Sequence, residues 1–138
     1  MLADWIEIGR GDVMPQYAGL HVTMNAKGDI VMNRYTHQEL GEPAAFSLQY
    51  DRANNRIGLK PTAKNARNAY PALKSNRTGI MVRGHRLLRE RRIMLPHTVQ
   101  FDDAEIDTDG ILILDLRTAR PSRRAQARQK FEAKRRDR

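Results

Sequence analysis

One order of short elements occurs twice along this chain, and it constrains the fold more than any other feature. Residues 29–60 and residues 79–117 each contain the pattern of a strand, a short helix and two further strands joined by a turn. The two segments share element order and element length more than residue identities, which predicts a degenerate internal duplication. The alternative is a chance match, because hairpins that follow short helices are common.

The first copy contains a strand that passes into a helix with no loop between them. DIVMN (29–33) alternates apolar and polar residues, and its final Asn is a favourable N-cap for the helix RYTHQEL. Gly41 supplies the C-terminal stop of that helix. A preceding strand at 21–25 and a hairpin between residues 46 and 60 complete the copy.

The second copy is expected to follow a polar connector and to repeat these elements. We expect a strand at 79–84, a helix at 85–93, and strands at 98–106 and 111–117 around the turn DTDG. The helical segment carries Leu87 and Leu88 as its apolar side, and arginines occupy most of its other positions.

Composition excludes several classes of protein. The chain of 138 residues has 40% hydrophobic residues, enough for one compact domain with appendages, and it has no cysteine. Disulfides, thiol catalysis and zinc–thiolate sites are therefore excluded. No apolar run reaches the length of a membrane span, and the first residues lack a signal-peptide layout. We expect a cytoplasmic protein that makes no membrane contact.

No pattern of an enzyme or a metal site stands out. The four histidines are scattered without metal-ligand spacing. EIDTDG (105–110) begins like a calcium-binding loop, but the twelfth position of such a loop falls on Leu116 rather than on a carboxylate. A hairpin turn is the better interpretation. We expect no enzymatic activity, no catalytic residues, no metal and no cofactor.

The net charge of +9 is concentrated at the C-terminal end. Residues 117–138 contain ten Arg or Lys and two acids, which leaves about +1 for residues 1–116. The tail has almost no apolar residue besides alanine and Phe131, so it forms no core, and its composition favours a helix once charge is neutralised. Such a polycation binds phosphate backbones with salt-sensitive affinity. The alternative is a disordered, solubilising tail.

The first copy also resembles a known family, on the residues from HVTMN to Pro61. Lys27-Gly28 precedes DIVMN, Leu40-Gly41 ends the helix, and Leu59-Lys60-Pro61 ends the hairpin. This pattern resembles the AbrB-type swapped-hairpin (looped-hinge-helix) family, which includes MraZ-like regulators with two such units in one chain. Two positions depart from the family pattern: its Ile-Pro is Met32-Asn33, and its helical Arg is His37.

The resemblance implies a mainly β fold with short helices, of the α+β class. Two units in one chain would form a tandem swapped-hairpin barrel, a pseudo-dimer in a single polypeptide, because one hairpin–helix unit is too small to bury its apolar face alone. We divide the chain accordingly into an N-terminal strand and loop (1–18), a first unit (19–61), a connector (62–78), a second, degenerate unit (79–117) and a basic tail (118–138).

The candidate nucleic-acid contacts fall into three groups. The resemblance places Lys27, Arg34 and His37 at positions that the family uses against DNA. The basic run 83–92 of the second copy offers Arg83, Arg86 and Arg89, although a solvated helix surface is an equal alternative. The tail offers Arg120, Arg123, Arg124, Arg128, Lys130, Lys134, Arg135 and Arg136.

These features favour a nucleic-acid-binding protein, expected as a prokaryotic or phage AbrB-like transcriptional regulator. It would bind duplex DNA, with RNA as the alternative, as a monomer or homodimer, and the tail would add phosphate contacts. The near-neutral first 116 residues leave a second class open, a structural or adaptor subunit with a protein partner in a larger ribonucleoprotein or phage assembly. An antitoxin is a third hypothesis.

Overall fold

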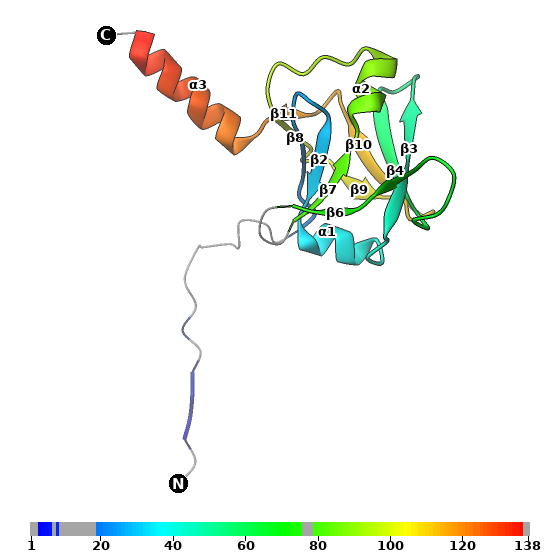
Figure 1. Ribbon diagram of the computed structural model, residues 1–138. Coiled ribbons are helices and arrows are strands. Elements are labelled where there is room, and N and C mark those ends of the chain that lie inside the picture. Colours follow the sequence, from blue (N-terminus) through cyan, green and yellow to red (C-terminus); the bar gives the residue numbers. More distant parts are fainter. Residues whose placement is uncertain (1–2, 7, 9–18, 76–78, 137–138) are drawn as a thin grey trace.

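A computed structural model describes residues 3–6, 8, 19–75 and 79–136. This part of the chain forms two β-sheets with 11 short strands and three helices (Figure 1). The expected class, mainly β with short helices, is confirmed.

The first sheet has six strands in the order β11-β8-β1-β2-β7-β6, and the second has five in the order β5-β3-β4-β10-β9. The strands of the six-stranded sheet are β1 (Val22–Met24), β2 (Asp29–Met32), β6 (Leu73–Lys74), β7 (Ile80–Arg83), β8 (Val99–Gln100) and β11 (Arg120–Pro121). The strands of the five-stranded sheet are β3 (Ala45–Asp51), β4 (Arg56–Thr62), β5 (Ala69–Pro71), β9 (Glu105–Ile106) and β10 (Leu112–Asp115). The helices are α1 (Arg34–Glu39), α2 (His85–Arg91) and α3 (Arg123–Arg136).

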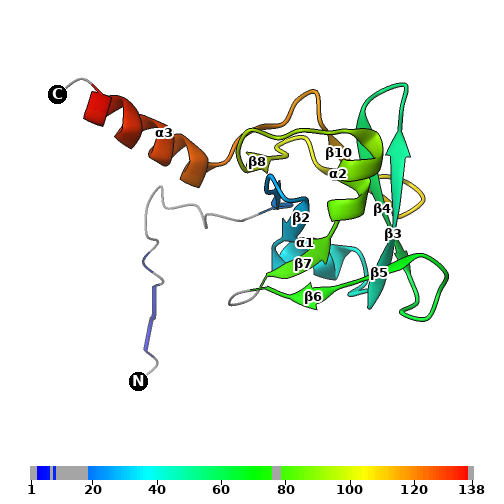
Figure 2. The same ribbon diagram turned by 45° about the horizontal axis from the view of Figure 1, so that its top comes forward.

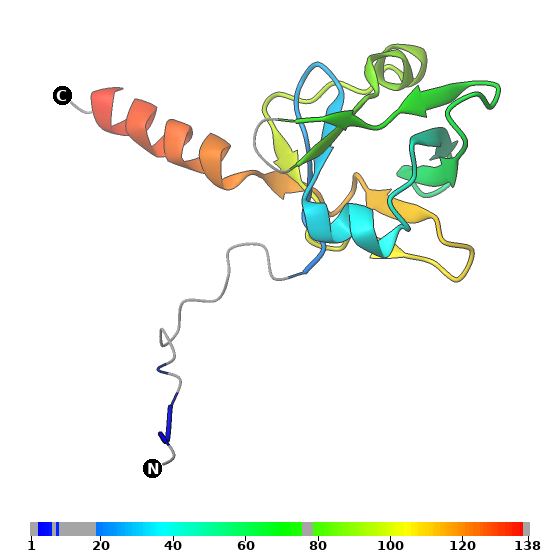
Figure 3. The same cartoon turned by 60° about the horizontal axis from the view of Figure 1, so that its bottom comes forward.

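The two halves show a related order of elements, with one strand broken in the second half. β2, α1, β3 and β4 in the first half correspond in order to β7, α2, a broken strand (β8 and β9) and β10 in the second. The halves meet along two antiparallel pairs, β2 with β7 and β4 with β10. Because β2 and β7 run in opposite directions, the helices that follow them lie at opposite ends of the sheets (Figures 1 and 3).

Strand periodicity builds one core between the sheets. Alternate residues of β1, β2 and β10 are fully buried, and Ile57, Gly58 and Leu59 are buried in succession at the centre of β4. Phe46 and Phe101 add the two largest buried side chains. The core residues with no solvent-exposed surface include Val22, Met24, Ile30, Met32, Ile57, Leu59, Leu112 and Leu114.

The strand-to-helix junction of the first copy forms as its sequence predicts. The Asn33 side chain accepts a hydrogen bond of 2.9 Å from the Thr36 amide and so caps α1. The buried Thr36 hydroxyl accepts from the amide of His21, 15 residues earlier, which fixes the helix to the beginning of β1. Gly41 follows the helix with φ at +87°, a conformation that favours glycine.

Three expected segments differ from the structure. The segment 62–78, expected as a connector, contains β5 and β6, which pair with different sheets. The expected strand 98–106 is interrupted after Gln100, because a turn from Phe101 to Ala104 sends β8 and β9 into different sheets. The expected N-terminal strand is not formed at residues 3–6 or 8, whose side chains are exposed; its other residues lie outside the described part.

A close contact between two glycines joins the copies. The Gly84 amide donates a 2.8 Å hydrogen bond to the carbonyl of Gly28, and a Cβ at Gly84 would lie 2.9 Å from that same oxygen. Gly28 also has φ at +102°. Both positions therefore require glycine. Gly84 has no room for a Cβ beside the opposite backbone, and Gly28 has both this restriction and a positive φ.

Gly84→Ala is expected to destabilise the protein by about 1–3 kcal/mol, because the added methyl group meets the backbone carbonyl oxygen of Gly28. The measurement is the free energy of unfolding from urea titration. Gly19→Ala is the control, since nothing lies within 4 Å of its added Cβ, and its effect is expected to stay below about 0.5 kcal/mol. Equal stability of the two variants would contradict this account of the junction.

Candidate nucleic-acid interface

The basic tail forms a helix that is attached to the sheet only at its beginning. The Ser122 amide donates to the carbonyl of Thr98 at 3.0 Å, next to the pairing of β11 with β8. The Ser122 hydroxyl accepts from the Ala125 amide at 3.1 Å, and the Gln126 side chain donates to the carbonyl of Pro121. Beyond this base, α3 projects away from both sheets (Figures 1 and 3).

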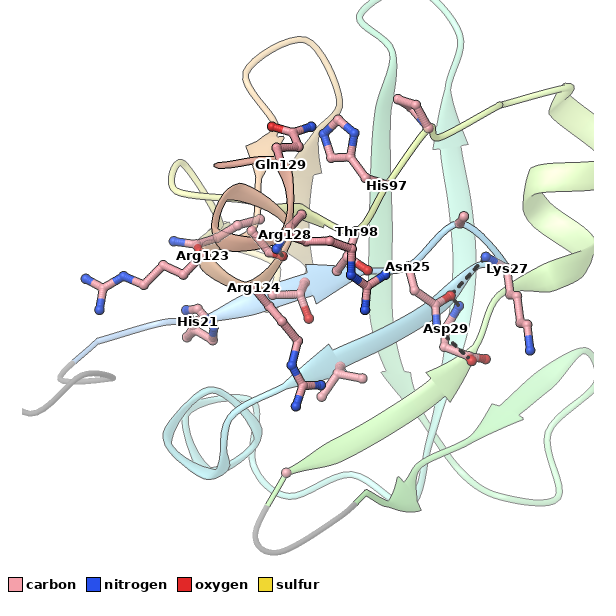
Figure 4. Close-up of a pocket in the computed structure, with 18 of the residues that line it drawn as sticks. His21, Asn25, Lys27, Asp29, His97, Thr98, Arg123, Arg124, Arg128 and Gln129 are labelled. Carbon is pink, nitrogen blue, oxygen red and sulfur yellow. Dashed lines mark hydrogen bonds between the residues drawn. The ribbon is translucent and has the colours of Figure 1, made fainter. Parts of the chain in front are cut away.

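An open cleft of about 1180 Å³ lies between α3 and the outer face of the six-stranded sheet. Val22 and Met24 point into the core, so Thr23 between them is on the outer face, as Val31 is on β2. From the other side, Arg124 and Arg128 of α3 extend toward this sheet (Figure 4). We call this space, bounded by α3, β1, β2 and the segment before β8, the cleft.

The charged groups of the cleft are mainly positive. Its lining includes four cationic side chains and two carboxylates among the described residues. The cations are Lys27, Arg123, Arg124 and Arg128, and the carboxylates are Asp29 and Glu132. An excess of arginine and lysine over acids favours a polyanionic ligand.

Asn25 organises the turn that carries Lys27 at the edge of the cleft. Its side-chain oxygen accepts hydrogen bonds from the amides of Lys27, Gly28 and Asp29 at 3.0, 3.0 and 2.9 Å. Its side-chain nitrogen donates to Asp29 Oδ2 at 3.0 Å (Figure 4). The turn therefore has internal hydrogen bonds that fix the backbone position of Lys27, whose side chain stays exposed.

The carboxylate of Asp29 is engaged by neighbouring groups. Burial acts to raise the pKa of Asp29, but hydrogen bonds from Asn25 and His85, with the charges of His85 and Arg83, bring it below its usual value. His85 Nε2 lies 2.6 Å from Asp29 Oδ1 and connects the turn to the beginning of α2. Asp29 thus stays ionised, with partners that offset its repulsion of an anionic ligand.

His21 lines the same cleft beside the base of α3. Burial lowers the pKa of His21, the nearby carboxylate of Asp102 opposes this shift, and the positive charge of Arg123 adds to it. A lowered pKa leaves the imidazole neutral at pH 7. At that pH, His21 therefore adds no positive charge to that of Lys27 and the three arginines of α3.

No protein-family model, curated protein or solved structure matches this chain. Within residues 3–6, 8, 19–75 and 79–136, no helix combines the length and the apolar character that a membrane span requires. The same residues contain no group of three or more His, Cys, Asp or Glu side chains arranged to hold a metal ion. The chemistry of the cleft is therefore the basis for assigning a function.

The structure brings four of the sequence-predicted site residues together. Lys27 comes from the first copy, and Arg123, Arg124 and Arg128 come from the tail, yet all four line the cleft. Lys130 and Lys134 lie on α3 with exposed side chains and are outside the lining, and Arg135 and Arg136 form the last turn of α3.

The remaining predicted residues lie elsewhere. Arg83, Arg86 and Arg89 are exposed at the end of β7 and on α2, where Arg86 pairs with Glu90 at 2.9 Å. Arg120 pairs with Asp102, and Arg34 is exposed at the beginning of α1. A hydrogen bond of 2.9 Å joins His37 Nε2 to the carbonyl oxygen of Pro43, and the ring lies against Phe46, which is a structural role.

Sequence reasoning missed most of the neutral polar residues of the cleft. Asn25 precedes Lys27-Gly28, and an Asn at the beginning of a tight turn is a signal that could have identified it. The others come from the outward positions of strands, from the segments before β1 and β8 and from α3, and no motif marks them. They are Thr23, His97, Thr98, Gln100 and Gln129, together with His21.

Proposed function

We propose that this protein binds nucleic acid, with duplex DNA as its ligand. The observation that carries this proposal is the position of α3, a helix with seven cationic residues and one acidic residue that faces a basic cleft. Arginine side chains on such a helix donate to phosphate oxygens, and the released counterions make the affinity dependent on salt.

The lining of the cleft favours a duplex over a single strand. Proteins that bind single strands stack the bases on aromatic side chains. Among the described residues that line the cleft, none is Phe, Tyr or Trp. Arginine, lysine and neutral amide groups instead suit the phosphate backbone of a duplex.

We further propose that the two copies form a tandem swapped-hairpin barrel of AbrB-like type and that the protein regulates transcription. Two features support this architecture: the antiparallel pairing of β2 with β7 and of β4 with β10 between the copies, and the passage of 69–74 and 98–106 from one sheet to the other. Of the three residues that the resemblance implicates, only Lys27 lines the cleft.

One observation favours an alternative function as a structural or adaptor subunit. Trp5, Ile6 and Ile8 are 92%, 76% and 84% exposed, and such apolar side chains suit a protein partner. Affinity capture with the full chain discriminates between the functions. A stoichiometric protein assembly without bound DNA supports the adaptor function.

The direct test of the proposed function is fluorescence anisotropy of a labelled 20-base-pair duplex with the full-length protein. We expect binding at 50 mM salt that weakens steeply toward 200 mM, since counterion release scales with the number of phosphate contacts. Absence of binding at 50 mM salt would refute the proposal.

Removing the acidic residue on α3 is expected to strengthen this binding. Glu132 lines the cleft, so Glu132→Gln removes a negative charge that repels phosphate, and we expect about two- to fivefold tighter duplex binding. Glu105→Gln is the matched control, because Glu105 is exposed on β9 of the other sheet. The same anisotropy titration measures both variants. An equal change in duplex affinity would contradict the account, because it would show that the place of the removed charge does not matter for binding.

A further inference from the structure

We propose that α3 enters the major groove of the duplex while one sugar–phosphate strand passes through the cleft between α3 and the six-stranded sheet. This inference rests on the proposed function and adds to it the groove, the inserted element and the path of one strand.

The shape of α3 fits the major groove. Its 14 residues span about 21 Å at 1.5 Å per residue. An α-helix with its side chains is about 10–12 Å wide, which matches the major groove of about 12 Å and exceeds the minor groove of about 6 Å. Among the described elements, α3 contacts mainly β11 at its base, and Figure 2 shows the rest of the helix clear of both sheets.

The cleft gives one strand of the duplex a place beside the inserted helix. A helix in the major groove has a sugar–phosphate strand along each side. On the side toward the sheet, Arg124 and Arg128 are one helical turn apart and face the cleft, with Lys27 at its far edge (Figure 4). Cations therefore reach the enclosed strand from the helix and from the β1–β2 turn.

The opposite face of α3 is then directed toward the bases. Ala127, Lys130 and Lys134 follow the spacing of one helix face, are exposed and do not line the cleft. Phe131, 64% exposed, lies beside this face in a tail that otherwise has alanine as its only apolar residue. Lysine contacts guanine acceptors in the major groove, and phenylalanine contacts the methyl group of thymine.

The absence of native cysteine allows a test on the full chain. Ala133→Cys supplies a single thiol at an exposed position of α3 that lies neither in the cleft lining nor among the base-facing residues, and an iron–EDTA group attached there cleaves DNA by a diffusible radical. Ala53→Cys, in the exposed β3–β4 turn, is the matched control. Anisotropy on the same labelled proteins measures duplex binding, and sequencing gels of a 30-base-pair duplex give the cleavage pattern.

We expect binding by both labelled proteins, and cleavage from position 133 with the 5′ offset between strands that marks a source in the major groove. The control at position 53 is expected to cleave at least tenfold less. A 3′ offset, or equal cleavage from both positions with binding intact, would overturn major-groove insertion and leave the proposed function standing. Loss of binding by the unlabelled protein as well would overturn the proposed function itself.

Discussion

Replacing Arg123, Arg124 and Arg128 by alanine is expected to weaken duplex binding about 100-fold at about 0.15 M salt. All three side chains line the cleft, and each phosphate contact contributes about 0.9 to the slope of log affinity against log salt. Extrapolated from about 1 M to about 0.15 M salt, one contact corresponds to roughly a fivefold change in affinity. Anisotropy titrations of the labelled duplex measure the difference.

A second triple variant separates local contacts from net charge. Arg52, Lys64 and Arg67 are exposed in the turns that flank β4, and none lines the cleft. Their replacement by alanine removes the same three charges, yet we expect less than about a threefold loss of affinity, because distant charges are screened at this salt concentration. Equal losses in the two triple variants would contradict a binding site at the cleft.

The largest expected effect on stability follows from Phe46→Ala. Phe46 is fully buried on β3, and its ring lies 6.4 Å from the ring of His37 between centroids. Removing it is expected to lower the free energy of unfolding by about 3–5 kcal/mol through lost burial and the cavity that remains. That is a large share of the roughly 5–15 kcal/mol typical of a folded domain.

Phe131→Ala is the control for this prediction because it deletes the same side chain from an exposed position on α3. Its free energy of unfolding is expected to change by less than about 0.5 kcal/mol. Urea titration followed by circular dichroism in the β-sheet region measures both variants. A loss below about 1 kcal/mol for Phe46→Ala would contradict the placement of this ring in the core.

Local signals in the sequence predict the elements that are long or capped. The Asn33 cap, the Gly41 stop and the Asp-Gly turn before β10 each fix a boundary through side-chain or backbone chemistry that depends on neighbouring residues alone. Asp107 in that turn accepts hydrogen bonds from the amides of Asp109 and Ile111. EIDTDG therefore forms the hairpin turn that its sequence predicts.

Long-range pairing decides the elements that the sequence does not predict. β5 and β8 have three and two residues, too few for a periodic pattern, and they exist because the distant strands β3 and β1 supply their partners. The interruption after Gln100 follows from the two ends pairing with different sheets.

The sequence predicts only one side of the cleft, because the other side depends on long-range strand pairing. The basic character of the tail is evident from composition, whereas the sheet face opposite α3 depends on how β11 pairs with β8. His37 shows the reverse case: its position in a family-like motif suggests a DNA contact, but its bonded partner is the carbonyl of Pro43.

The most direct measurement of the central claim, that α3 and the adjoining sheet face bind duplex DNA, is the salt dependence of affinity in two proteins. Log affinity is plotted against log salt concentration for the unchanged protein and for the variant with alanine at 123, 124 and 128. We predict that the slope of the variant is shallower by about 2.7, the value for three lost phosphate contacts. Identical slopes would contradict the claim, because they would show that these arginines contact no phosphate.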